Sequence, residues 1–211
     1  MNSDLTILDD DPEDDAPDEG LHRDSDTPEP HSGPLRQAAV LVPLVRKNAG
    51  WHFQFIRRAT NQADRHSGQV AFPGGRQEPE DLSAEAAALR EAEEEIGLPP
   101  TSVRVLGRLT DYRTISNYAV TPVVAIIEHP FTPVLQISEV ARAFTIPLDW
   151  LRERHNFTRR ARASMDPASA RRHPVIVFEE YDGEVLWGAT ARMTLNCLRA
   201  IDGGQIALST D

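Results

Sequence analysis

A run of acidic residues near the middle of the chain is the first place where residue types and spacing indicate chemistry. Residues 89–98 read LREAEEEIGL. On an α-helix, which turns about 100° per residue, Glu91, Glu94 and Glu95 share one face. Their like charges repel, and the single guanidinium of Arg90 balances only part of them. Carboxylates gathered in this way suit a hard divalent cation, and an ordinary solvated helix face is the alternative.

The elements that must position these carboxylates follow from the hydrophobic pattern. The stretch from about Leu82 to Ile96 is rich in Ala, Glu and Leu and predicts the helix, which Gly97 and the following proline pair end. Strand patterns cover residues 37–47, 51–58, 70–75, 103–112, 119–128, 136–145, 173–180 and 184–187, and shorter helical patterns cover 147–154 and 189–201. Frequent hairpins with few helices predict an α+β fold with a mixed β-sheet.

The charge of the chain is concentrated near its N-terminus. Residues 1–30 contain 12 of the 33 acidic residues and one basic residue, Arg23, so this stretch alone carries the net charge of −11. Residues 1–34 have no aromatic and few aliphatic side chains, so we predict a disordered acidic tail over 1–34 and a folded domain over 35–211. The remaining 21 acidic and 21 basic residues balance, which gives no overall basic field for nucleic acid.

Composition excludes several other classes of protein. The single cysteine, Cys197, excludes a disulfide framework and a cysteine-based zinc site, and we expect it to be a buried small hydrophobic residue. The first residues, MNSDLTILDD, are not typical of a secretory signal, and no stretch approaches the roughly 18 apolar residues of a membrane span. We therefore expect a cytoplasmic protein that binds neither membrane nor nucleic acid. Its oligomeric state, monomer or homodimer, stays open.

The residues around the acidic run resemble the box of the Nudix hydrolase family, G-x5-E-x7-R-E-U-x-E-E-x-G-U, where U is a bulky aliphatic residue. Residues 90–98, REAEEEIGL, match the second half of this box, with Ala92 at a position that usually holds a larger aliphatic residue. In the first half, Gly75 lies one residue farther from Arg90 than in the family, and Asp81 stands where the family has Glu. The resemblance implies a Nudix-type α/β/α sandwich with a mixed sheet and makes the solvated-face alternative a minor one.

The resemblance also implies roles for the box residues in the hydrolysis of a diphosphate. Glu91 and Glu95 would be the principal ligands of Mg²⁺ or Mn²⁺, and Glu94 would be a further ligand or the base that orients water. Arg90 would hold one of these carboxylates in place. Such metal ions neutralise the charge of a diphosphate and lower the pKa of a bound water.

Residues outside the acidic run complete the candidate site. Nudix enzymes often recruit another acidic residue as ligand or base, and Glu139, on the strand predicted over 136–145, is our candidate, with Asp111 as a weaker alternative. Gly74 and Gly75 would let the backbone turn sharply and approach the phosphates or the metal closely.

The stretch before the box bears on the substrate. Residues 66–75, HSGQVAFPGG, resemble the signature of the coenzyme A pyrophosphatase subfamily, and residues 120–124 and 187–191 are also similar to it. The run before this signature keeps only Arg58-Ala59 of the subfamily's usual pattern. The resemblance implies hydrolysis of CoA or an acyl-CoA to 3′,5′-ADP and (acyl-)4′-phosphopantetheine. The substrate-binding residues that it implies are Arg58, His66, Gly68, Gln69, Gly74 and Gly75.

The distribution of arginines also bears on the CoA hypothesis, and other substrates are alternatives to it. CoA carries a 3′-phosphate, which calls for arginines away from the metal, and Arg58 or the arginine-rich residues 152–162 are the candidates. For the arginines beyond Arg162, the simpler interpretation is a solvated loop around Met165-Asp166-Pro167. Alternative substrates are ADP-ribose, a dinucleotide or an oxidised nucleotide. A non-catalytic Nudix-fold regulatory module is a further alternative, which the intact set of box carboxylates disfavours.

Overall fold

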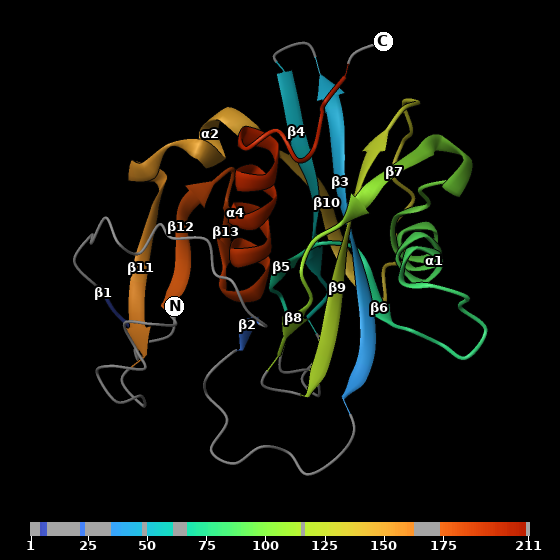
Figure 1. Ribbon diagram of the computed structural model, residues 1–211, viewed down its shortest axis with the longest axis horizontal. Coiled ribbons are helices and arrows are strands. Elements are labelled where there is room, and N and C mark those ends of the chain that lie inside the picture. Colours follow the sequence, from blue (N-terminus) through green and yellow to red (C-terminus); the bar gives the residue numbers. More distant parts are fainter. Residues whose placement is uncertain are drawn as a thin grey trace.

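The two long helices of the structure lie on opposite sides of a large β-sheet (Figure 1). The computed structural model describes residues 5–7, 22–23, 35–47, 50–60, 67–114, 117–162 and 174–209. Helix α1 (Ala84–Ile96) covers one face of the sheet, and helix α4 (Gly188–Asp202) packs on the other side. The predicted α+β class, with an α/β/α sandwich around a mixed sheet, is therefore confirmed. In the described part of the chain, every helix is too short or too polar to cross a membrane.

Strand β3 (Arg36–Lys47) is central to the large sheet. The strands run in the order β10 (Val140–Pro147), β4 (Gly50–Arg58), β3, β9 (Tyr118–Ile127), β8 (Tyr112–Arg113) and β2 (His22–Arg23). Three further strands, β5 (Val70–Ala71), β6 (Gly74–Arg76) and β7 (Val103–Arg108), pair with β4, β3 and β9. Strand β3 is parallel to β9 and antiparallel to β4 and β6, so the sheet is mixed.

Strand β3 is apolar on both faces because both faces are covered. Ala39 and Leu41 pack in the core beneath α1, whereas Val42 and Leu44 pack in the core that includes α4. A continuous apolar run, rather than an alternating one, is what a strand buried on both faces requires.

A smaller antiparallel sheet leads into α4. Its strands run in the order β1 (Leu5–Ile7), β11 (Phe157–Arg162), β12 (Val175–Tyr181) and β13 (Glu184–Trp187). The short helices α2 (Leu148–Arg152) and η3 (Arg154–Asn156) connect β10 to β11, and η2 (Pro100–Ser102) precedes β7. The turn between β12 and β13, at Asp182-Gly183, is the hairpin turn that the sequence predicts.

Three elements differ from the prediction. Strand β10 begins only at Val140, because the backbone N–H groups of Glu139 and Val140 both donate to the carbonyl of Gln136 and close a turn there. The strand expected over 103–112 is interrupted after Arg108. The hydrophobic pattern does not predict β11, whose sequence FTRRAR lacks apolar alternation.

Within the predicted tail, the described strands β1 and β2 pair with β11 and β8. The rest of residues 1–34 lies outside the described residues.

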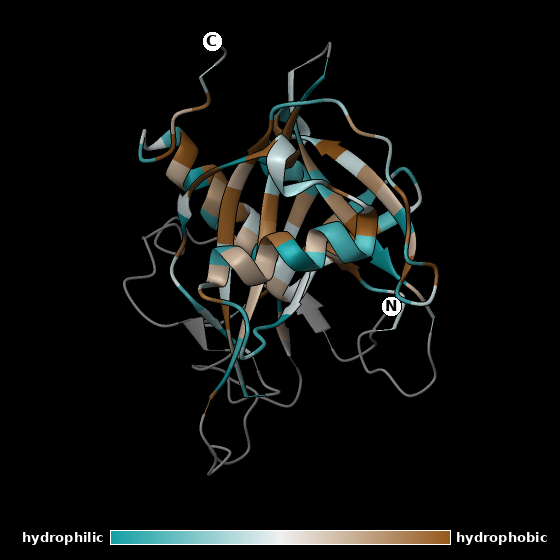
Figure 2. Ribbon diagram, turned by 90° about the vertical axis from the view of Figure 1, so that its right-hand side faces the viewer, coloured by the Kyte–Doolittle hydropathy of each residue, from teal (hydrophilic) through white to brown (hydrophobic). Residues whose placement is uncertain are grey.

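Helix α1, which lies in front of the large sheet in Figure 2, is bounded by capping residues. The Ser83 hydroxyl accepts from the backbone N–H of Ala86 at 3.2 Å, and Gly97, with φ of 66°, ends the helix in the left-handed conformation. The side chains of α1 that face the sheet are mostly alanines. Small side chains on this face bring the helix backbone near the sheet and near β6, which carries Gly74 and Gly75.

Candidate functional site

Glu95 is a buried carboxylate in contact with the Gly74 backbone. Its residue surface is only 2% exposed, and Oε2 accepts from the backbone N–H of Gly74 at 3.0 Å. Burial raises the pKa of Glu95 to about 7, although the Gly74 N–H and the positive charge of Arg58 oppose this increase. Glu95 therefore lies in the inner part of the site, where an ionised carboxylate needs a positive partner.

Glu91 lies over Gly75. An ideal Cβ built on Gly75 would be 2.6 Å from Cδ and Oε1 of Glu91, so only glycine leaves room for this carboxylate. Burial raises the pKa of Glu91, and a hydrogen bond from Arg90 opposes the increase. Glu91 and Glu95 thus both lie against the Gly74-Gly75 backbone.

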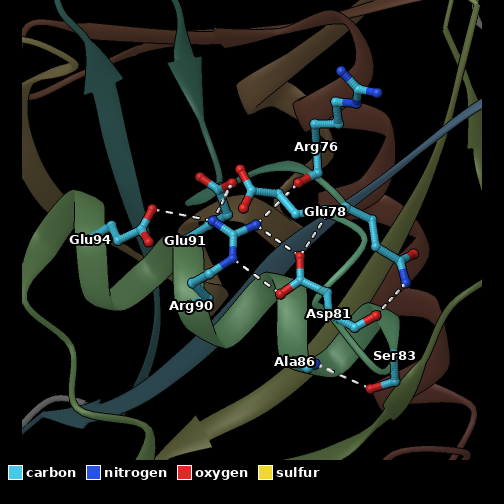
Figure 3. Close-up of polar contacts among 9 residues, drawn as sticks. Arg76, Glu78, Asp81, Ser83, Ala86, Arg90, Glu91 and Glu94 are labelled. Carbon is cyan, nitrogen blue, oxygen red and sulfur yellow. Dashed lines mark hydrogen bonds and ion pairs between the residues drawn. The ribbon is translucent and has the colours of Figure 1, made fainter.

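Glu94 differs from the other two box glutamates because its side chain is 59% exposed. Arg90 Nη1 lies 3.0 Å from Oε1 of Glu91 and 3.2 Å from Oε2 of Glu94, so one guanidinium joins both carboxylates (Figure 3). The three glutamates therefore form a gradient from buried Glu95 to exposed Glu94 rather than one solvated face. Arg90 holds carboxylates in place, in the way that the family resemblance implies.

Asp81 is the principal partner of Arg90, a role that the box pattern left unassigned. Arg90 Nε and Nη2 donate to the two Asp81 carboxylate oxygens at 3.1 and 2.9 Å, and Nη2 also donates to the carbonyl of Arg76 (Figure 3). These hydrogen bonds lower the pKa of Asp81. Despite the extra residue in the loop, Asp81 reaches the guanidinium because its own carboxylate is held by the backbone N–H of Glu78 at 2.8 Å. The sequence signal for this contact with Arg90 was that Asp81 lies six residues after Gly75, where the family box has an acidic residue.

Arg58 and Glu139 lie beside each other at the ends of paired strands. The Ala59 N–H donates to the carbonyl of Glu139 at 2.7 Å, immediately after Arg58 at the end of β4. The charge of Arg58 lowers the pKa of Glu95, whereas Glu139 raises the pKa values of both Glu91 and Glu95. The two predicted residues are therefore close enough to the carboxylates to act on them. Glu139 is exposed and belongs to the turn before β10, not to the predicted strand.

The signature before the box lines the same end of β4. The Gln69 carbonyl accepts from the backbone N–H of Arg58 at 2.9 Å, and Gly68 adopts a φ of 71° in the turn before it. A Cβ on Gly74 would lie 2.4 Å from the carbonyl oxygen of Ala39, which explains the glycine at this position. His66, another predicted substrate contact, lies outside the described residues.

The other predicted candidates have partners outside the acidic box. Asp111 accepts from the Thr121 hydroxyl at 2.8 Å. The hydrogen bond to Glu85 raises the pKa of Arg108, and the negative charge of Asp111 adds to this increase. Among the arginines of residues 152–162, Arg152 pairs with two acidic residues on the surface, and Arg159 is 5% exposed and lies over the ring of Phe157. Residues 157–162 form strand β11, and residues 163–173, which include the predicted loop beyond Arg162, lie outside the described residues.

The donor chemistry of the inner carboxylates fits a divalent cation. Within the described ranges, no three His, Cys, Asp or Glu side chains already converge as a complete ligand set. Glu91 and Glu95 are nevertheless hard oxygen donors whose pKa values burial raises, and the negative charge of Glu139 adds to the increase. A divalent cation would stabilise the ionised forms of these groups. Glu91 and Glu95 would hold the ion, and Glu94 and Glu139 would be further acidic groups available to it.

Comparisons with known proteins agree with this geometry. A family model described as the NUDIX domain matches residues 35–166. The protein named Uncharacterized Nudix hydrolase NudL, from Escherichia coli (strain K12), is 44% identical over 113 residues, which are 54% of this chain and 58% of NudL. The match thus spans less than two thirds of that relative's length.

Solved structures share the fold at low sequence identity. A Nudix hydrolase from M. smegmatis, RenU, superposes with a TM-score of 0.54 and 18% identity, over 84% of this chain and 92% of that chain. A MutT/nudix family protein from Enterococcus faecalis superposes with a TM-score of 0.51 and 14% identity, over 83% of this chain and 66% of that chain. At these identities, the two likenesses concern the fold alone.

Proposed function

The chain belongs to the Nudix family, and from this premise we propose that it is a pyrophosphohydrolase dependent on Mg²⁺ or Mn²⁺. It would cleave the diphosphate linkage of a nucleoside diphosphate derivative, with CoA or an acyl-CoA as the preferred substrate. The products would be 3′,5′-ADP and 4′-phosphopantetheine or its acylated form. Small nucleotides, rather than nucleic acid, would be its partners.

The observation that carries the proposal is the pair of carboxylates against the glycine turn. Glu91 fills the space above Gly75, and Glu95 is held by the Gly74 N–H. Both have raised pKa values, because the charges of Arg90 beside Glu91 and of Arg58 near Glu95 only partly oppose the effect of burial. Such a site favours a divalent cation together with an anionic ligand, and a metal-bound diphosphate supplies both.

The side chains of this chain have distinct roles in the proposed reaction. The bound metal supplies charge neutralisation at the diphosphate and a lowered pKa for water. Glu91 and Glu95 hold it, and Arg90, fixed by Asp81, keeps Glu91 oriented.

Three further side chains would act on the substrate and on the attacking water. Arg58 would face the negative charge of the diphosphate because it lies beside Glu95. Glu139, exposed and close to both inner carboxylates, would accept the proton of the attacking water, with Glu94 as the other exposed carboxylate available.

The preference for CoA rests on the signature rather than on the carboxylates. Gly68 and Gln69 of that signature lie against the end of β4 that carries Arg58, so the signature and the proposed metal site adjoin each other. This arrangement supports a role for the signature in substrate binding. ADP-ribose, a dinucleotide or an oxidised nucleotide remains the second candidate, because the carboxylates and Arg58 would serve any diphosphate.

A substrate panel tests the proposal. Purified protein would be incubated with CoA, dephospho-CoA, acetyl-CoA, ADP-ribose and a dinucleoside polyphosphate, with Mg²⁺ or Mn²⁺, and products identified by mass. We expect the highest kcat/KM with CoA or acetyl-CoA, and we expect no hydrolysis of any substrate in the absence of metal. Faster cleavage of ADP-ribose than of CoA would favour the second candidate. No cleavage of any compound with either metal would favour a regulatory module.

A further inference from the structure

A β-bulge lies beside the two residues that approach the carboxylates from strands β4 and β10. Val140 pairs with Arg58 and Arg142 with Arg57, so Ala141 is the extra residue between them. Its effect is visible in the packing. Val140 packs in the core beneath α1, whereas an unbroken alternation would place it on the same face as Arg142. The bulge thus turns the start of β10, next to Glu139, toward the α1 face.

The bulge also sets two arginines opposite each other on the other face. Arg57 and Arg142 are cross-strand neighbours, and like charges in this position destabilise a strand pair. Their neighbours, Phe55 and Phe144, belong to the core on the α4 side, and Arg142 lies 5.1 Å from the ring centroid of Phe144. Arg58, one residue farther along β4, acts on Glu95 on the α1 side.

Glu184, the first residue of β13, forms ion pairs with both arginines. Its Oε1 lies 3.3 Å from Nη1 of Arg57 and 3.0 Å from Nη1 of Arg142, and its side chain is only 4% exposed. Arg142 is held further by the Asp182 carboxylate and by the Asp182 carbonyl at 2.8 Å. The β12–β13 hairpin therefore ties the bulged ends of β4 and β10 together from behind the site.

We propose that Glu184 is a positioning residue for the diphosphate site. By bridging Arg57 and Arg142 across the bulge, it holds the end of β4 against the start of β10, so that Arg58 and Glu139 keep their places beside the box carboxylates. Glu184 itself faces away from α1 and contacts neither the carboxylates nor the substrate in this assignment. The expected effect of Glu184 on turnover rests on the proposed function, whereas its expected effect on the positions of Arg58 and Glu139 does not.

The test begins with Glu184→Gln, which keeps the shape and removes the charge. Hydrogen exchange of the Arg58 and Ala59 amides, measured by NMR, reports directly on the contacts with Gln69 and Glu139. We expect these amides to exchange roughly tenfold faster in the variant, since local opening becomes easier. Glu128→Gln is the matched control, because Glu128 pairs with Arg104 at a remote strand edge. Unchanged exchange in Glu184→Gln would overturn the proposal.

Activity and a second variant separate positioning from a general loss of stability. We expect kcat on the best substrate of the panel to fall roughly tenfold in Glu184→Gln, with the Mg²⁺ concentration for half activation unchanged, because the ligands on α1 do not contact Glu184. The double variant Arg142→Gln/Glu184→Gln should be no more impaired than Glu184→Gln alone, because both variants break the same bridge. A double variant whose losses clearly exceed those of Glu184→Gln would show that Glu184 does not act through Arg142.

These readouts also distinguish the two proposals. Faster amide exchange in Glu184→Gln, in a protein without activity on any compound of the panel, would retain the positioning role and reject the proposed function. If the amides of Arg58 and Ala59 exchange faster in Glu184→Gln but kcat is unchanged, the ion pairs of Glu184 do not affect turnover.

Discussion

The carboxylate of Glu91 occupies the space that a side chain on Gly75 would need, with Cδ and Oε1 both 2.6 Å from an ideal Cβ. Glycine at position 75 is therefore required by a side chain from a different element, helix α1. The clash involves the end of a flexible side chain, not backbone. A larger residue at position 75 would displace Glu91 and leave the strand in place.

Gly75→Ala should accordingly separate activity from stability. We expect kcat/KM to fall on the order of 100-fold, since a displaced ligand costs much of the metal-dependent rate, whereas the melting temperature changes by only a few degrees. The measurements are turnover with saturating Mg²⁺ and thermal unfolding. Gly203→Ala, at a glycine with φ of −79° beyond the end of α4, is the control. Retained turnover in Gly75→Ala would contradict the contact's role.

Glu91→Gln tests the ligand itself without changing its size. The amide is a weaker ligand and carries no charge, so turnover should fall on the order of 100-fold or more at saturating Mg²⁺. The metal-free protein should unfold at the same temperature or a higher one, because Glu91 and Glu94 no longer repel. The comparison variant is Glu93→Gln, at an exposed glutamate of the same helix. Near-normal turnover in Glu91→Gln would remove Glu91 from the metal site.

Asp81→Asn tests how far Arg90 depends on its bidentate partner. The asparagine keeps one acceptor but loses the charge, so we expect a loss of about 1–2 kcal/mol in the free energy of unfolding and a roughly tenfold lower kcat. Asp149→Asn is the matched control, because Asp149 pairs with Arg152 on the surface and is 85% exposed. Equal behaviour of the two variants would mean that Asp81 has no special role.

The acidic tail can be tested by deletion of residues 1–34. In the part of the chain whose burial the structure describes, every core residue lies at position 38 or later. We therefore expect the melting temperature to change by no more than about 2 °C and turnover on a small substrate to stay unchanged. A loss of several degrees, measured by thermal unfolding, would show instead that β1 and β2 tie the tail to the domain.

The sequence was most informative where local pattern and residue chemistry coincide. The spacing within residues 89–98 predicted the face of Glu91 and the pairing of Arg90 with neighbouring carboxylates, because both follow from helix geometry. It did not predict that Glu95 is buried, since burial depends on the approach of β6, which lies elsewhere in the sequence. The sequence also did not predict the β4–β10 bulge or the ion pairs of Glu184, because both depend on the register of strands that are distant in the sequence.

The pH dependence of stability is the last prediction, and it rests on Glu95. Its pKa is raised from an ordinary value of 4.5 to about 7 in the folded protein, so folding favours the protonated form. The stabilisation is complete below about pH 4.5 and is lost as the pH rises through about 7. At 1.36 kcal/mol per pH unit, this difference corresponds to at most about 3 kcal/mol. Unfolding of the metal-free protein by urea, measured from pH 5 to 8, should therefore show falling stability in the wild type.

Glu95→Gln removes this titration while its side-chain oxygen can still accept from the Gly74 N–H. The variant should lose less stability between pH 5 and 8 than the wild type, and Glu93→Gln, on the exposed face of the same helix, should keep the wild-type slope. Mg²⁺ should reduce the wild-type slope between pH 5 and 7, because binding favours the ionised carboxylate and so lowers the pKa of Glu95 in the folded state. Identical slopes for the wild type and Glu95→Gln in the absence of metal would contradict the raised pKa.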